Sequence, residues 1–220
     1  MVLFLRRIYL AHIKNFKTQY IDEAVLLIIA AAVHIIFRTD KMYVNVLSLI
    51  ELKLQKFDER FQLIVLEKDE FIGEVNDKDI QAFTEIIPQD NKALHSIVVP
   101  SNVYEGACKG NFQDRMTLAH ELAHYILHGM LQIPVSELKD GESCSKYEDP
   151  EAIADMLARF LLSVCGLAQN MSAAELSSEC GLSEEDAASV QKEYKEGISK
   201  IVLKIKTVFC KNKISSKPSA

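Results

Sequence analysis

The feature that most constrains this chain is the pentapeptide HELAH at residues 120–124, because it lies inside a stretch with helical periodicity. Apolar residues recur every four positions from Leu118 to Ile126. The spacing predicts an amphipathic helix with Asp114 as its N-cap and Gly129 as its left-handed C-cap. Two histidines four residues apart lie on one face of a helix, so the fold has to present two imidazoles side by side.

Histidines at this spacing are typical of a metal site. His120 and His124 can ligate one ion, for which we expect Zn2+. Glu121 can reach a metal-bound water without being a ligand, which makes it the natural general base. Zinc lowers the pKa of such a water from about 16 to about 7. The alternative is a pair of surface histidines, and the helix predicted around the motif favours the metal site.

A third protein ligand is expected from the next predicted helix. It opens with Asp149-Pro150-Glu151, a capping residue followed by proline and then an acid in the first turn. Glu151 and Asp155 share one helical face, so Glu151 can bind the metal while Asp155 accepts a hydrogen bond from the free ring nitrogen of a ligand histidine. The alternative is an ordinary first-turn glutamate and a surface ion pair between Asp155 and Arg159.

Two further residues are weaker candidates for that ligand. Glu148 lies just before the same helix and is the fallback. His128 continues the histidine series, but a rise of about 6 Å beyond His124 on a straight helix carries it away from the ion. Residues 125–127 offer no break that would bring it back.

The remaining pattern indicates an α+β fold. No internal repeat or Gly/Ser linker is present, and we divide the chain into an N-terminal helical region (1–60), a core (61–170) and a C-terminal helical segment (171–220). The expected elements are helices over 20–38, 43–56, 149–165 and 171–209, strands over 61–66, 71–75 and 94–100, a loop over 101–113 and a polar connector over 130–148.

Charge and cysteine content limit the partners and the compartment. The net charge of −6 argues against nucleic-acid binding by the whole chain, although residues 1–20 and 200–220 are basic and could contact nucleic acid or anionic lipid. The apolar stretch 24–37 is too short to span a membrane, for which about 20 residues are needed. Five cysteines without CxxC spacing, and no evident signal peptide, favour a cytoplasmic protein.

Two runs of sequence resemble the ImmA/IrrE metallopeptidase family. RMTLAHELAHYILH at 115–128 is similar to that family's R-[FM]-T-x-A-H-E-[LI]-[GA]-H-x-[LI]-L-H signature. EAIADMLARFLL at 151–162 is similar to its E-x-x-A-[ND]-x-F-A-x-x-L-L-M-P pattern. Leu157 replaces the usual Phe, and Ser163-Val164 replace the usual Met-Pro, at packing or helix-exit positions away from the proposed ligands.

The resemblance implies a zincin-like core, in which a small sheet packs on the HExxH helix and on the helix of the glutamate ligand, with helical additions at both ends. It implies zinc on His120, His124 and Glu151, Glu121 as base and Asp155 behind the ligands. It also implies a zinc-dependent endopeptidase whose protein substrate is a helix-turn-helix repressor or another regulatory protein. The alternatives are a binding module that sequesters a repressor without cutting it, and a peptidase tethered to a membrane by residues 1–37.

Other positions carry secondary expectations. Strand 94–100 could pair with an extended substrate at its edge, and Arg115 is expected to anchor the structure. Tyr147 or Tyr104 could supply an oxyanion donor, and Cys108 is a remote candidate for an inhibitory ligand. Residues 174–188 resemble a helix-turn-helix, but the acids at 184–186 would repel phosphate, so a helical pair with a structural or partner-docking role is expected.

Overall fold

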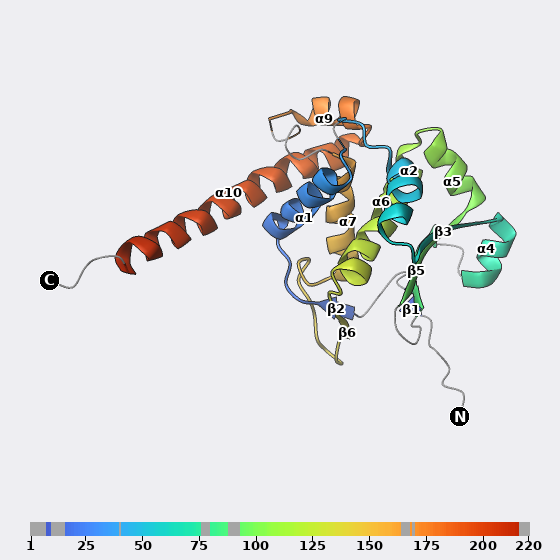
Figure 1. Ribbon diagram of the computed structural model, residues 1–220, viewed down its shortest axis with the longest axis horizontal. Helices are drawn as coiled ribbons and strands as arrows, with labels where there is room; N and C mark the ends of the chain where they lie inside the picture. Colours follow the sequence, from blue (N-terminus) through green and yellow to red (C-terminus); the bar gives the residue numbers. More distant parts are fainter. Residues whose placement is uncertain are drawn as a thin grey trace.

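The computed structural model describes residues 8–9, 16–39, 41–75, 80–87, 93–163, 168 and 170–215, and these form an α+β fold (Figure 1). A four-stranded sheet has the order β1-β4-β5-β3, and β2 and β6 form a separate pair. The strands are β1 (Ile8–Tyr9), β2 (Phe16–Thr18), β3 (Phe61–Leu66), β4 (Phe83–Ile87), β5 (Leu94–Pro100) and β6 (Val135–Glu137). The helices are α1 (Glu23–Ile36), α2 (Val46–Ser48), η1 (Leu49–Leu54), α3 (Gln55–Phe57), α4 (Lys68–Val75), α5 (Ser101–Cys108), α6 (Phe112–His124), η2 (Tyr125–Met130), α7 (Pro150–Leu162), α9 (Ala173–Cys180) and α10 (Glu184–Ser215).

Strand β5 lies inside the larger sheet. It pairs in parallel with β3 and antiparallel with β4 along its length. The prediction of a strand over 94–100 is confirmed, but the suggestion that this strand offers an edge to a substrate is wrong. Its partner β4 was not predicted, and with that strand in place both sides of β5 are already hydrogen-bonded.

Two segments predicted as strand and loop are helical. Residues 71–75 belong to α4, which carries Asp69 and Glu70 in its first turn, where acids favour a helix, and buries Phe71 against the sheet. Residues 101–108 form α5, because Val103 and Ala107, four positions apart, are buried on one face. Both helices are only eight residues long, so they provide little sequence periodicity.

The HExxH helix is confirmed, but both of its ends differ from the prediction. Asn111 is the N-cap and its side chain accepts hydrogen bonds from the amides of residues 113 and 114, whereas Asp114 lies in the first turn. Beyond His124 the chain continues as the π-helical turn η2 through Gly129. The left-handed residue that follows is Gln132, with φ 53°. Gly129 is required there for space, since a Cβ would lie 2.9 Å from the Tyr125 ring.

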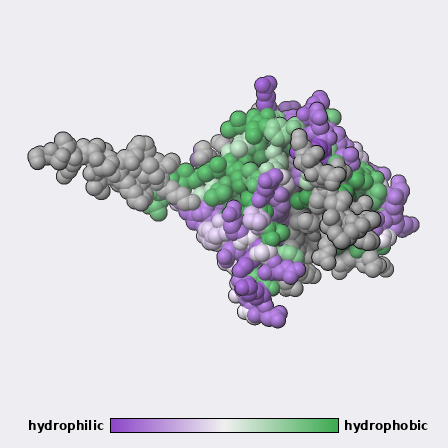
Figure 2. Space-filling view, turned by 60° about the horizontal axis from the view of Figure 1, so that its bottom comes forward, coloured by the Kyte–Doolittle hydropathy of each residue, from purple (hydrophilic) through white to green (hydrophobic). Residues whose placement is uncertain are grey.

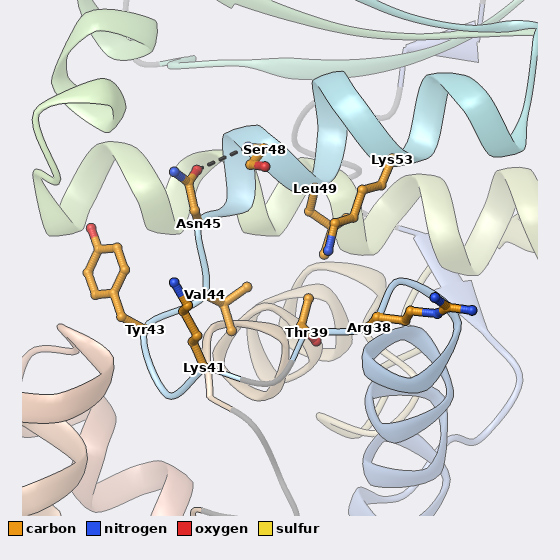
Figure 3. Close-up of a pocket in the computed structure, with 9 residues that line it drawn as sticks. All are labelled: Arg38, Thr39, Lys41, Tyr43, Val44, Asn45, Ser48, Leu49 and Lys53. Atoms are coloured by element: carbon orange, nitrogen blue, oxygen red, sulfur yellow. Dashed lines mark hydrogen bonds between the residues drawn. The ribbon is translucent and has the colours of Figure 1, made fainter.

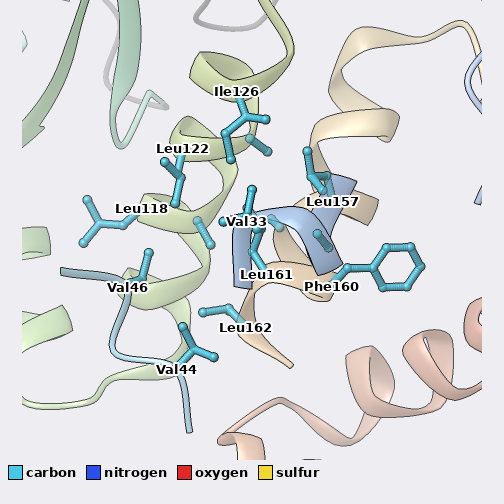
Figure 4. Close-up of a cluster of buried hydrophobic side chains, with 14 of the residues drawn as sticks. Val33, Val44, Val46, Leu118, Leu122, Ile126, Leu157, Phe160, Leu161 and Leu162 are labelled. Carbon is cyan, nitrogen blue, oxygen red and sulfur yellow. The ribbon is translucent and has the colours of Figure 1, made fainter. Parts of the chain in front are cut away.

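Helix α7 begins as predicted. Asp149 is its N-cap, accepting a hydrogen bond from the amide of Glu151, and Pro150 occupies the first turn. The helix ends at Leu162, and the predicted end at 165–166 lies outside the described residues. Helices α6, α7 and α1 enclose the centre of the core, which holds the labelled side chains of Figure 4: Val33, Val44, Val46, Leu118, Leu122, Ile126, Leu157, Phe160, Leu161 and Leu162.

Arg115 has the anchoring role expected of it. Its guanidinium is buried and donates to the main-chain oxygens of Val44, Cys180 and Gly181 at 3.0–3.2 Å, and it lies 3.9 Å from the centroid of the Tyr43 ring. One side chain of α6 therefore holds together the loop before α2 and the turn between α9 and α10.

The C-terminal helices form the predicted structural pair. Helix α9 is capped by Ser172 and ends at Gly181 in the left-handed conformation, and α10 packs on α9, α7 and α1. Helix α10 then continues away from the body of the molecule (Figure 1). Within the described residues, no helix combines the length and apolar character needed to cross a membrane.

We expect the stability of this fold to fall below about pH 6.5. His34 of α1 is buried, lies 3.2 Å from the main-chain oxygen of Phe160, and has its pKa lowered by burial. Burial also lowers the pKa of His95 and His128. At these three histidines the unfolded chain takes up protons at a higher pH than the folded chain does, so their contribution to stability is lost as the pH falls.

Urea unfolding between about pH 7.5 and about pH 5 tests this. The free energy of unfolding should fall with pH in the unsubstituted chain, and less steeply in His34→Gln, where only His95 and His128 still contribute in this way. An equally steep fall in both proteins would remove His34 from the account.

Candidate metal centre

Three side chains from α6 and α7 meet where the end of α6 crosses the start of α7. His120 Nε2 and His124 Nε2 are 3.0 Å apart. The Glu151 carboxylate lies 3.2 Å from His120 Nε2 through one oxygen and 3.3 Å from His124 Nε2 through the other. These three residues form a group whose ligand atoms all lie within 4.8 Å of one another, and the group could hold a metal ion.

The separations suit a small tetrahedral ion. Zinc binds histidine nitrogen and carboxylate oxygen at about 2.0–2.1 Å, so two ligand atoms of one tetrahedron are about 3.3 Å apart. The separation of the two imidazole nitrogens and the two distances from these nitrogens to the carboxylate are 3.0–3.3 Å, close to that value. The side chain of His124 is fully buried, whereas His120 and Glu151 are 19% and 24% exposed, so one side of the group faces solvent.

Asp155 lies behind the first histidine, one turn after Glu151. Its carboxylate is 2.7 Å from His120 Nδ1. That contact makes Nδ1 the donor and leaves Nε2, on the side of Glu151, to act as a ligand. Arg159, the alternative partner considered for Asp155, instead pairs with Glu193 of α10 at 2.8 Å.

The same contacts set the charge of the group. Burial opposes protonation of His120, but the hydrogen bonds that its ring donates to Asp155 and Glu151 outweigh it and raise its pKa to about 10. Burial likewise opposes ionisation of Glu151, yet its contacts with His120 and His124 hold its pKa below the usual range. Without a metal ion, His120 therefore carries a proton that an ion binding at Nε2 has to displace.

Glu121 is buried beside this group, and a residue of the sheet fixes its position. The Thr84 hydroxyl of β4 lies 2.8 Å from a carboxylate oxygen of Glu121 and 2.9 Å from its main-chain oxygen. Thr84 is the residue near the site that sequence reasoning missed. Its strand was not predicted, so no pattern in the sequence connected Thr84 with the HExxH helix.

The other candidate ligands lie outside the group. Glu148 accepts hydrogen bonds from Ser145 in the connector. His128 stacks on His124 with ring centroids 5.7 Å apart, and its Nδ1 lies 2.8 Å from the main-chain oxygen of Ile133. Cys108 is exposed at the end of α5. None of the three belongs to the described ligand group.

Neither tyrosine considered as an oxyanion donor is free to serve as one in this arrangement. The Tyr104 hydroxyl donates to Glu51 at 2.8 Å, and the Tyr147 hydroxyl donates to Glu23. The Tyr104 hydroxyl therefore joins α5 to η1, and the Tyr147 hydroxyl joins the connector to α1.

A separate pocket of 260 Å³ lies beside the loop between α1 and α2 (Figure 3). None of the predicted site residues lines it. Of its basic residues, Lys53 donates to the main-chain oxygen of Phe37 at the end of α1, and Arg38 takes the left-handed conformation that ends this helix, with φ 49°. Because carbonyl oxygens at a helix C-terminus attract cations, these groups are accounted for by the end of α1.

Comparison with protein-family models, with curated proteins and with solved structures finds no match to this chain.

We expect Asp155→Asn to weaken zinc binding by about 10- to 100-fold, because an amide is a poorer acceptor and no longer fixes the proton on His120 Nδ1. Competition titration against a chromophoric chelator measures this, with Asp69→Asn on the exposed face of α4 as the control. Equal affinities in the two variants would contradict the role assigned to Asp155.

Proposed function

We propose that the chain is a zinc-dependent endopeptidase with a zincin-like core. The observation that carries the proposal is the ligand group itself. Two histidines of one helix and a glutamate of the next have donor atoms at the mutual distances that zinc requires, with a second glutamate, Glu121, beside them. A site that only holds a metal has no need of a buried acid at that position.

The residues have separate tasks in this proposal. His120, His124 and Glu151 would hold the ion, which when bound supplies a Lewis acid that lowers the pKa of water and polarises a carbonyl. Glu121 takes a proton from the attacking water and returns it to the leaving amine nitrogen. Thr84 orients Glu121, and Asp155 orients His120.

The resemblance to the ImmA/IrrE family supports a substrate class. Both of its sequence runs coincide with the helices that carry the ligand group, α6 with η2 and α7. We therefore propose that the substrate is a DNA-binding repressor of the helix-turn-helix type, cut by this chain in the cytoplasm without contact between the chain and nucleic acid.

The test is a cleavage assay on a panel of purified helix-turn-helix repressors, with products identified by mass spectrometry. Cleavage should stop when a chelator removes the metal and return when zinc is added. A metal-loaded chain that binds the repressor tightly and leaves it intact would instead support the sequestering module. No binding and no cleavage would contradict the proposed substrate.

A further inference from the structure

Helix α1 is apolar on all sides, and one of its faces is uncovered. Residues 24–37 carry no Asp, Glu, Lys or Arg. One face packs into the core, whereas Val25, Ile28, Ile35 and Ile36 on the opposite side are 38%, 57%, 77% and 52% exposed. We call these four residues the α1 stripe. Aliphatic side chains that recur along an exposed helix face mark an interaction surface.

Tyrosines and lysines gather at the N-terminal end of α1. Tyr20 is 59% exposed and its ring centroid lies 5.3 Å from that of Tyr147. Lys146 and Lys200 place their ammonium groups 4.7 and 5.0 Å from the Tyr147 ring. Both lysines also pair with the buried Glu23, so the acid at this end of α1 is neutralised.

The apolar surface continues onto α10. The two helices pack closely at Gly197, where a Cβ would lie 2.4 Å from a methyl group of Leu27. Just beyond this contact Val202 and Leu203 are 43% and 65% exposed. Figure 2 shows hydrophobic surface reaching the root of the projecting helix. After Glu196 the sequence has six lysines and no acid.

We propose that the α1 stripe and the root of α10 form a docking face for a lipid bilayer that contains anionic headgroups. An aliphatic centre bordered by tyrosine and lysine matches the boundary between acyl chains and headgroups. The six lysines that follow Glu196 in the sequence supply the attraction to anionic lipid. The chain would lie on the surface, because none of the described helices can cross a bilayer.

The other occupants fit this face less well. Nucleic acid would satisfy the lysines and leave the isoleucines in water, since its phosphates offer no apolar surface. A second copy would cover the isoleucines but would bring another lysine-rich segment of the same charge to the same place. An anionic bilayer satisfies both features. The proposal does not depend on the metal centre.

Flotation of the full chain with vesicles tests the proposal. The chain should float with two parts phosphatidylcholine to one part phosphatidylglycerol, less with phosphatidylcholine alone, and less as salt is added. Ile28→Ser with Ile35→Ser should lower the partition coefficient by about tenfold or more, because both side chains are exposed in the free protein and buried in the bilayer.

The matched control is Leu52→Ser with Leu131→Ser, which removes two leucines that are 57% and 50% exposed away from the stripe and should bind as the unsubstituted chain does. Circular dichroism of each variant checks folding. Equal flotation of the two double variants, or no flotation of the unsubstituted chain on anionic vesicles, would overturn the proposal. So would a dimer in light scattering that only the isoleucine substitutions dissociate.

Discussion

Glu121→Gln should cut the repressor about 10²- to 10⁴-fold more slowly than the unsubstituted chain, while still binding zinc. Gln has the same shape as Glu and can keep a contact with the Thr84 hydroxyl, so the helix and the ligand group should be unchanged. It cannot take a proton from water, and this loss accounts for the whole effect. The measurement is the single-turnover cleavage rate, with zinc content determined on the same sample.

The control for this substitution is Glu105→Gln, which removes an acid that is 65% exposed on α5 and should leave the rate unchanged. If Glu121→Gln cut the repressor as fast as the control does, Glu121 would not be the base. If Glu121→Gln lost zinc as well as activity, Glu121 would contribute to metal binding, and its proposed role as a base that does not bind the metal would be contradicted.

Arg115→Met should lower the free energy of unfolding by about 3 kcal/mol or more. The substitution removes the donor for three main-chain oxygens, those of Val44, Cys180 and Gly181, and leaves them without it in a region closed to water. It also removes the cation that lies against the Tyr43 ring. A buried acceptor that loses its donor costs more than a surface contact does.

Urea unfolding of Arg115→Met beside Arg60→Met measures this effect. Arg60 is 43% exposed, makes an ion pair with Asp58 at 3.5 Å and donates to one main-chain oxygen, that of Ala93, so its loss should cost about 1 kcal/mol. Equal losses in the two variants would show that Arg115 does not hold the loop and the α9–α10 turn together.

The elements that the sequence predicts well are those whose signals are local. The capping order Asp149-Pro150-Glu151 places the start of α7 and puts Glu151 in its first turn. The spacing of His120 and His124 depends only on helical geometry. A metal site needs several nearby ligands of a few residue types, and His120, His124 and Glu151 are of those types. The sequence could therefore predict that these residues of two separate helices lie close together before the packing of the helices was known.

The elements that the sequence misses depend on contacts with other elements of the fold. Helix α5 contains Gly106, which disfavours a helix, but the Asp114 side chain occupies the space beside it, where a Cβ would lie 1.8 Å from a carboxylate oxygen. Strand β4 is defined by its pairing with β5, the next strand along the chain, and with β1, which is far from it in sequence. Thr84 reaches Glu121 only through that pairing, and for this reason no local pattern could identify it.

The most direct test of the central claim is the zinc content of the purified chain beside Glu151→Gln and Glu148→Gln. The two glutamates are three residues apart, but only Glu151 contacts both histidines, whereas Glu148 bonds to Ser145. We predict about one zinc per chain in the unsubstituted protein and in Glu148→Gln, and less than about a tenth of that in Glu151→Gln after dialysis. Full zinc in Glu151→Gln, or loss of zinc in Glu148→Gln, would contradict the assignment of the third ligand and with it the proposed metal centre.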